Sequence, residues 1–358
     1  MNFDVSEEQQ LLQDTVGQYI ENECPLPRLR EIFESEEGHD PALWKGFAEI
    51  GLTGLHVSEQ YGGAGLEMID LALATETVAY GGMPGPFFGH ALACLALEQG
   101  ASEEQKKRWL PGLASGELLG TVALGESDGV WQPEQWTLPA GEKLSGMKAY
   151  VPYGSISDLI VVGTAGPGLA LAERGSSGVE VERYDGVDRA RRLDTVVFQE
   201  APCQVLPGGK AAAPRLRDAG LCLLAADAFG VGKRLVDMSV AYAKEREQFG
   251  VTIGHFQALK HQLANMALEI EPARGLYWYA AHAFDHLREE AERAAALAKA
   301  HITDRAMQIA RDALEVHGGI GFTWECDVQI WFKRAIFDRT FLGIPSLHRE
   351  RAAQLAGW

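Results

Sequence analysis

The chain has 358 residues, more than one hydrophobic core usually serves, so its length predicts two or three domains. Hydrophobic residues make up 46% and charged residues 23%, a globular composition that excludes an intrinsically disordered chain. The formal net charge of −18 excludes nucleic acid and anionic membrane surfaces as expected partners, because both require clustered Lys and Arg.

Neither a membrane anchor nor a targeting segment is expected. The longest apolar runs, such as Leu221 to Ala226, fall far short of the roughly 20 residues of a membrane-spanning helix. The N-terminal segment, Met1 to Glu8, is acidic and has neither the basic nor the apolar region of a signal peptide. The five cysteines are odd in number and scattered, which favours reduced thiols over a zinc site or a disulfide framework. These features predict a cytoplasmic protein.

Helical signals dominate the first third of the chain. Ser6 and Gln9 have the spacing of a capping box, and Leu12, Val16 and Ile20 continue the pattern on one helical face. Further helical patterns follow, separated by glycine-rich turns: Pro41 to Ile50, Ile69 to Ala79, His90 to Gln99 and Ser102 to Trp109. Residues 1–112 are therefore expected to form an all-helical N-terminal domain.

The middle of the chain has a different character. Helical periodicity fades after Gly120, and short β-rich runs such as Leu159 to Val162 and Thr195 to Phe198 are bounded by Gly, Pro and Asp. Residues 113–212 therefore predict a small β-barrel or β-sandwich domain.

Long helices return after Pro214. Apolar residues recur at spacings of three and four in two stretches, Phe256-Leu259-Leu263-Met266-Ile270 and Ile302-Ala306-Ile309-Ala313. The Ala- and Glu-rich stretch Glu289 to Ala300 predicts a solvated helix face. Residues 213–358 are expected to form a four-helix bundle with more apolar surface than its own core uses, which oligomerisation would cover. The predicted class is an α+β multidomain fold.

Two clusters in this last region combine a cation, aromatic rings and glycines. The first runs from Arg246 to Gly250 and resumes at Gln257, and the second spans His317 to Phe322. We interpret Arg246 and Phe249 as neighbours on one helical face, and the glycine turn as a source of bare backbone amides. Such groups together suit the pyrophosphate of a dinucleotide.

In this order the clusters resemble the acyl-CoA dehydrogenase family. The resemblance covers nearly the whole chain, with further matching blocks at Glu49 to Leu55, Glu59 to Gly65 and Gln105 to Pro111. It implies the fold of that family and FAD as cofactor, shared at a subunit interface where residues of one chain hold the ADP half of a neighbour's FAD. The residues at the matching positions are Arg246, Phe249, Gln257, Glu315, Gly318 and Gly319.

Each of these positions also has a simpler interpretation. An isolated Arg246 would be a surface arginine in a weak ion pair. Gly318 and Gly319 could simply end a helix, a role that is compatible with cofactor contact. Glu315 stands where the family usually has glutamine, and a carboxylate is unfavourable near a pyrophosphate unless it faces a hydroxyl. His317 is expected to pack rather than to catalyse.

Two segments of the β domain match those that bind the flavin ring in the family, but both have lost side chains typical of it. They are Ala123 to Asp128, with no threonine ahead of Glu126, and Lys148 to Pro152, with no tryptophan beside the lysine. A flavin ring needs fixed hydrogen-bond donors. We therefore do not expect a flavin bound mainly by this chain's own β domain.

The resemblance also points to an absence. Dehydrogenation of a thioester requires a carboxylate that removes the α proton. The two family positions for this glutamate are matched here by Gly220 and by Leu342-Gly343, neither of which can accept a proton. No catalytic residue is assigned to this chain, although Asp218 or Asp338 could serve as a displaced base.

The resemblance therefore implies one subunit of a heteromeric, α2β2-like, FAD-dependent acyl-CoA dehydrogenase acting on a bulky acyl-CoA such as a steroid side-chain thioester. Its expected partners are a homologous catalytic subunit that supplies the base, the acyl-CoA, and an electron acceptor such as electron-transfer flavoprotein. Two alternatives stay open: a self-sufficient homo-oligomeric acyl-CoA dehydrogenase with a displaced base, and a non-enzymatic scaffold that keeps the fold.

Overall fold

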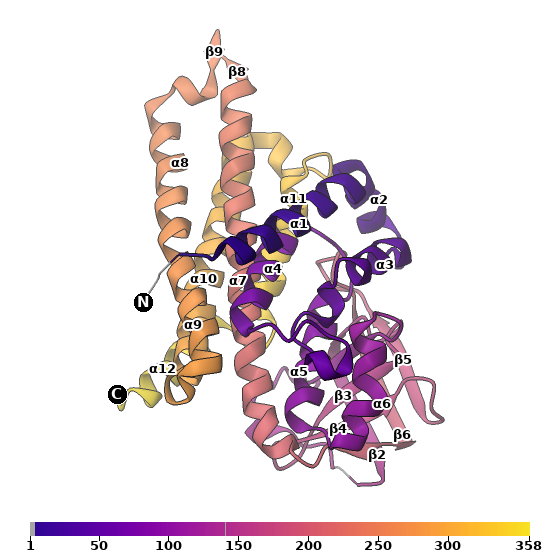
Figure 1. The fold of residues 1–358 in the computed structure, drawn as a ribbon. Helices are drawn as coiled ribbons and strands as arrows, with labels where there is room; N and C mark the ends of the chain where they lie inside the picture. Colours follow the sequence, from indigo (N-terminus) through magenta and orange to yellow (C-terminus); the bar gives the residue numbers. More distant parts are fainter. Residues whose placement is uncertain (1–3, 140) are drawn as a thin grey trace. The chain divides into compact units, whose positions relative to one another are not determined.

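The computed structural model describes residues 4–139 and 141–358. The first three residues, which belong to the acidic N-terminal segment considered above, lie outside the described residues, as does Ala140. The chain forms two compact units, whose elements are drawn in Figure 1. The helical unit comprises the chain up to Leu26, Ala72–Met83 and Leu221–Trp358, and the mixed unit comprises Pro27–Leu71 and Pro84–Gly220.

The helical unit begins with α1 (Glu7–Glu23). The Ser6 hydroxyl accepts a hydrogen bond from the Gln9 amide at 3.1 Å, and the Gln9 side chain accepts one from the Ser6 amide at 3.0 Å. The predicted capping box is thus confirmed. Val16 and Ile20 bury the inner face of this helix.

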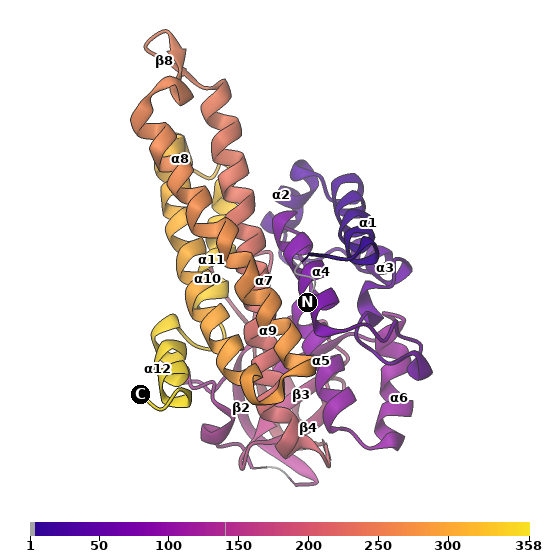
Figure 2. The ribbon, with the colours of Figure 1, turned by 60° about the vertical axis from the view of Figure 1, so that its left-hand side comes forward.

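Long helices make up the rest of the helical unit. In Figures 1 and 2, α7 and α8 rise side by side to a short hairpin of β8 and β9, and α10 lies alongside them. The bounds are α7 (Gly209–Glu245, in this unit from Leu221 onward), β8 (Glu247–Gln248), β9 (Val251–Thr252), α8 (Gln257–Ile270), α9 (Arg274–His286), α10 (Arg288–His317), α11 (Val328–Thr340) and α12 (Pro345–Leu355).

The two predicted apolar stripes lie on α8 and α10, and they are buried to different extents. All four residues of the α10 stripe, Ile302 to Ala313, are buried as predicted. In α8 only Met266 and Ile270 are buried, because the opposite end of the helix approaches the hairpin, where little packs against it. In the stretch Glu289 to Ala300, Glu289, Glu290 and Arg293 are exposed, as expected for a solvated helix face. Its alanines and Lys299 are buried, since this small-residue surface of α10 packs against α9 and α12.

The mixed unit contributes helices and all the longer strands. Its helices are α2 (Leu26–Glu34), α3 (Pro41–Glu49), the start of α4 (Met68–Tyr80), α5 (Phe87–Gly100) and α6 (Glu103–Ala114). A second capping box, between Ser102 and Gln105, begins α6. The indole N–H of Trp44 donates to the Gly116 carbonyl at 3.0 Å and ties α3 to the segment after α6.

Two sheets form the β part of this unit. One sheet has the order β1-β3-β4-β7, with β1 parallel to β3 and the other pairs antiparallel, and the second is an antiparallel sheet of order β2-β6-β5. The bounds are β1 (Gly120–Ala123), β2 (Lys143–Pro152), β3 (Leu159–Thr164), β4 (Gly168–Glu173), β5 (Val179–Tyr184), β6 (Leu193–Pro202) and β7 (Gln204–Val205).

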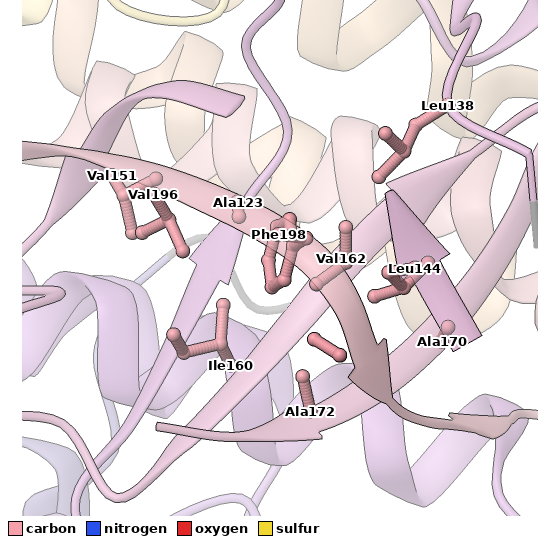
Figure 3. Close-up of a cluster of buried hydrophobic side chains, with 11 residues drawn as sticks. Ala123, Leu138, Leu144, Val151, Ile160, Val162, Ala170, Ala172, Val196 and Phe198 are labelled. Carbon is pink, nitrogen blue, oxygen red and sulfur yellow. The ribbon is translucent and has the colours of Figure 1, made fainter. Parts of the chain in front are cut away.

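A buried apolar cluster fills the space between these strands. Figure 3 shows side chains from β2 and β6, such as Leu144 and Phe198, with Ile160 and Val162 of β3. Alternating residues of β3 and β4 supply it together with residues of β2 and β6, as in a β-sandwich. The predicted combination of N-terminal helices, a middle β region and a C-terminal helical bundle is thus confirmed. The boundaries 1–112, 113–212 and 213–358 stay a prediction.

Among the residues that the structure describes, no helix combines the length and the apolar character needed to cross a bilayer.

Candidate functional site

The first predicted cluster lies where α7 gives way to the hairpin. Helix α7 ends at Glu245, and the Arg246 carbonyl accepts a hydrogen bond from the Ile253 amide across the hairpin at 2.7 Å. Phe249 and Gly250 form the two-residue turn, with φ values of 57° and 81°. The interpretation of Arg246 and Phe249 as neighbours on one helical face is therefore wrong, because two successive left-handed residues turn the chain back on itself.

Phe249 occupies an unfavourable position. A left-handed backbone costs a bulky residue roughly 1 kcal/mol or more. Its side chain is 92% exposed, so little burial offsets that cost. The ring of Phe256 lies edge-on to it, at 6.1 Å between centroids. The hairpin thus holds an aromatic ring and the exposed Arg246 side chain out toward solvent.

Gln257 lies at the first position of α8 and is exposed. Phe256, which precedes it as N-cap, offers no side-chain cap to the first backbone amides of the helix. The amide side chain of Gln257 and those backbone N–H groups therefore lie together at the hairpin end of α8, where the helix dipole favours a negative group.

The second predicted cluster lies at the end of α10. The helix stops at His317, and Gly318 follows with φ 65° and ψ −146°, so the predicted glycine stop is confirmed. A Cβ on Gly318 or Gly319 would meet no atom within 4 Å, whereas one on Gly321 would lie 2.6 Å from the Leu314 carbonyl oxygen. The first two glycines thus leave backbone open to a ligand, while the third serves packing. The expectation of bare amides is wrong for Gly318, because its N–H donates to the Glu315 carbonyl as the helix cap.

Two contacts bring the clusters to the same end of the bundle. The His317 ring stacks on Tyr242 of α7 at 4.3 Å, and Nδ1 of His317 bonds the Ala313 carbonyl at 2.7 Å. The Gln262 amide of α8 donates to the exposed Glu315 carboxylate at 3.4 Å. Burial lowers the pKa of His317, in keeping with a neutral packing residue.

Two further exposed aromatic side chains lie at this end: Phe322, which closes the second cluster, and Trp324, which was not singled out from the sequence. Phe322 is 67% exposed, and Trp324 carries the Lys333 ammonium 3.4 Å from its ring centroid. In the sequence, two aromatic residues directly after a glycine turn could have indicated a binding surface here. With Arg246, Gln257 and the open backbone at Gly318 and Gly319, these rings suit an anionic nucleotide.

The two positions matched to the family's base carry no carboxylate in the structure. Gly220 lies within α7, in the mixed unit. Leu342 is buried at φ 58° and Gly343 follows at φ 107°. The buried His348 ring holds this turn through Nε2 and the Leu342 carbonyl, 3.1 Å apart.

The nearby aspartates have structural partners. Asp218 bonds the Arg217 guanidinium at 2.8 Å and 2.7 Å. Asp338 is fully buried, and its main-chain carbonyl accepts a hydrogen bond from Lys299. Neither carboxylate projects freely toward a substrate.

The two β-domain segments matched to flavin-ring contacts meet each other. Lys148 and Glu126 form a buried ion pair at 2.7 Å, and the Glu126 carboxylate also accepts the Thr137 amide at 3.0 Å. A Cβ on Gly125 would lie 2.9 Å from the Trp131 ring, so that ring packs directly on the segment. Their charged groups therefore satisfy one another rather than a ring system.

These observations fit one end of FAD better than the whole molecule. Arg246, Gln257 and the backbone at Gly318 and Gly319 fit a pyrophosphate or an adenosine, since they are exposed and lie at one end of the bundle. The donors that would orient a flavin ring in the chain's own β domain are engaged internally.

Comparison with known proteins agrees with this architecture. The model of the acyl-CoA dehydrogenase N-terminal domain matches residues 6–117, and that of the C-terminal domain matches residues 219–356. The acyl-CoA dehydrogenase IpdE2 of Mycolicibacterium smegmatis is 32% identical over 355 residues, covering 98% of each chain.

Solved structures give the same result. A variant of the Tcur3481-Tcur3483 steroid ACAD superposes with a TM-score of 0.90 at 31% identity, covering 98% of each chain. PigA with FAD and proline superposes with a TM-score of 0.89 at 25% identity, covering 100% of this chain and 99% of that one. This chain belongs to the acyl-CoA dehydrogenase family, whose members use FAD.

Proposed function

We propose that this chain is the non-catalytic subunit of a heteromeric, FAD-dependent acyl-CoA dehydrogenase, and that it completes a cofactor site on a homologous catalytic subunit. The observation that carries the proposal is a mismatch between two parts of the chain. The hairpin end of the bundle presents exposed nucleotide-binding groups, whereas Gly220 and Leu342-Gly343 stand where the reaction needs a carboxylate.

The assembled enzyme would form a 2,3-enoyl-CoA. A carboxylate of the catalytic subunit removes the α proton, and FAD, when bound, supplies the acceptor for the hydride that leaves the β carbon. Arg246 would offset the charge of the pyrophosphate, and Gly318 and Gly319, which lack a Cβ, would let it approach the backbone closely. Phe249 and Phe322 would exclude water from the nucleotide by packing against it.

The substrate class and the assembly are proposed from a relative. The name Tcur3481-Tcur3483 steroid ACAD joins two gene products and names a steroid substrate, and that structure matches this chain over 98% of its length. A bulky CoA thioester such as a steroid side chain, an α2β2-like arrangement and an acceptor such as electron-transfer flavoprotein follow by analogy. A cytoplasmic location is proposed with them.

The self-sufficient alternative requires a displaced base. Asp218 is held by Arg217 on two nitrogens, and Asp338 is fully buried. A carboxylate held by a guanidinium is a poor base, because the cation favours its ionised form. These contacts favour the heteromeric proposal.

The test co-expresses the chain with its catalytic partner and compares Arg246→Ala with Arg288→Ala, a matched exposed arginine at the first residue of α10. We expect Arg246→Ala to lower the FAD content of the purified complex at least tenfold, since charge-assisted hydrogen bonds contribute about 1.5 to 3 kcal/mol each. Arg288→Ala should keep full FAD content. Unchanged FAD in both variants would support the scaffold alternative instead.

A second measurement addresses the homo-oligomeric alternative. The chain purified alone should be colourless and should not reduce a dye acceptor with any acyl-CoA. A yellow preparation with acyl-CoA-dependent dye reduction would refute the heteromeric proposal, and loss of that activity in Asp218→Asn or Asp338→Asn would identify the base.

A further inference from the structure

The mixed unit concentrates arginines in a chain that is otherwise strongly acidic. Arg183 ends β5 together with Tyr184, and Arg189, Arg191 and Arg192 follow in the loop before β6. The chain as a whole has 50 acidic residues against 32 basic ones. Four arginines within ten residues are therefore an unusual local excess of positive charge for this acidic chain.

Arg192 is the centre of this cluster and is buried, with 8% of its surface exposed. One of its terminal nitrogens donates to the Ser35 carbonyl, and its Nε has no hydrogen-bond partner. Within residues 4–139 and 141–358, no carboxylate forms an ion pair with it. A buried cation without a counter-charge is costly, and a bound anion would remove that cost.

Among the described residues, none of the neighbouring carboxylates forms an ion pair with Arg192. Burial is the main cause that lowers the pKa of Arg192, and the positive charges of Arg183 and Arg189 lower it further, whereas Tyr153 and, less strongly, the exposed Asp185 raise it. Arg183 pairs with Glu36 at 3.2 Å, but 84% of that glutamate side chain is exposed, so the pair is weak.

Two further carboxylates near the loop are buried. Asp188 accepts the Ala190 amide at 3.0 Å, and Asp194, which interacts electrostatically with Arg183, accepts the Ser155 amide at 2.8 Å. The Arg191 guanidinium lies 5.9 Å from the Phe88 ring centroid. Four arginines thus face four carboxylates, of which Glu36 and Asp185 are exposed.

The loop is held in place before any ligand arrives. The buried Tyr153 hydroxyl lies 2.6 Å from the Gly38 carbonyl and 2.7 Å from the Ala190 carbonyl, and it accepts the Gly85 amide at 3.1 Å. Gly38 has φ 58°, and a Cβ there would lie 2.6 Å from Nε of Arg192. The absence of a Cβ at Gly38 therefore leaves room for the Arg192 side chain.

We propose that Arg183, Arg189 and Arg192 form a binding site for a phosphate group. Guanidinium groups match the geometry of phosphate oxygens, and Arg192 is fixed while Arg189 is half exposed and able to reach a ligand. A CoA thioester carries a 3′-phosphate and a diphosphate, so it is the first source of that phosphate. This assignment of source, though not the site itself, depends on the proposed function.

The test titrates the full chain with three ligands, CoA, dephospho-CoA and inorganic phosphate, by calorimetry. Arg189→Gln is the main variant because its side chain is not buried, and Arg108→Gln, an exposed arginine of the same unit, is the control. We expect Arg189→Gln to weaken CoA binding about tenfold, the loss of one charge-assisted hydrogen bond, while Arg108→Gln leaves it unchanged.

The three ligands show which phosphate the site binds: the 3′-phosphate of CoA, its diphosphate or free phosphate. A tenfold loss for CoA with no change for dephospho-CoA assigns the site to the 3′-phosphate, and equal losses for both assign it to the diphosphate. Inorganic phosphate that binds wild type and is lost in Arg189→Gln, with CoA unaffected, assigns the site to free phosphate.

Identical titrations for wild type and Arg189→Gln with all three ligands would overturn the inference. Arg192→Met could fail to fold, so its thermal unfolding is recorded first and its titration is interpreted only if the variant folds. FAD content of the Arg246→Ala complex tests the proposed function separately, so either idea can fail without the other.

Discussion

The interior of the helical bundle and its hairpin end use charged and aromatic side chains in opposite ways. In the interior, Arg334 bonds both oxygens of Asp227, at 2.9 and 2.8 Å, and the Met83 carbonyl at 2.9 Å. At the hairpin end, Arg246 is exposed, and Phe249 is held out to solvent at a strained φ. The first arrangement stabilises the fold, whereas the second costs stability without packing in return, which is typical of residues retained for a partner.

The largest expected effect concerns the interior pair. Asp227→Ala leaves the Arg334 guanidinium buried without its carboxylate, which should lower the free energy of unfolding by about 3 to 5 kcal/mol. Denaturant unfolding of the purified chain measures this. Glu269→Ala, which removes an exposed pair with Arg305 at 3.1 Å, should cost less than about 1 kcal/mol. Equal losses in the two variants would contradict the contrast drawn here.

The second-largest expected effect concerns the pH dependence of stability, for which the buried His90 and the exposed His255 are compared. His90 is fully buried between the Thr53 carbonyl and the Gly120 amide, and burial lowers its pKa to about 4. An unfolded histidine protonates near pH 6.5, so the stability associated with neutral His90 is complete above pH 6.5 and is lost as the pH falls to 4. This loss should reach about 3 kcal/mol.

Unfolding free energies measured between pH 7 and 4 test this expectation. His90→Gln should flatten the profile, whereas His255→Gln, at the exposed hairpin end, should leave it as in wild type. A profile that keeps its slope in His90→Gln would show that other groups cause the acid sensitivity.

The smallest expected effect is that of Phe249→Asn, which should raise the stability of the isolated chain but lower the FAD content of the complex. Phe249→Asn places Asn-Gly in the turn, the pair that a two-residue hairpin with positive φ favours. We expect the isolated chain to gain about 0.5 kcal/mol, because asparagine tolerates the left-handed region and the lost ring contacts are few. The complex should nevertheless lose FAD. A variant that is destabilised and keeps its flavin would reverse the interpretation of Phe249 as a residue retained for binding.

Local signals in the sequence predicted several elements well. The Ser6 capping box, the stop of α10 at Gly318 and the buried stripe of α10 all follow from short-range rules that tertiary contacts did not override. The resemblance of the motifs carried the family and the fold.

Features that depend on the rest of the molecule could not be predicted in the same way. The hairpin after Arg246 was missed because Phe249 is a poor residue for a left-handed turn, so local preference pointed to helix. The burial of the α10 alanines was not predicted, because α9 and α12, which cover them, are brought there by the fold. The arginine cluster around Arg192 depends on Ser35 and Gly38, which lie far away in the sequence.

The most direct test of the central claim is the ratio of flavin to polypeptide in the complex purified from co-expression with the catalytic partner, measured by flavin absorbance and quantitative amino-acid analysis. Because this chain would contribute to a shared site without forming one of its own, we predict one FAD for every two chains. One FAD for each chain, with the chain alone also retaining flavin, would contradict the account.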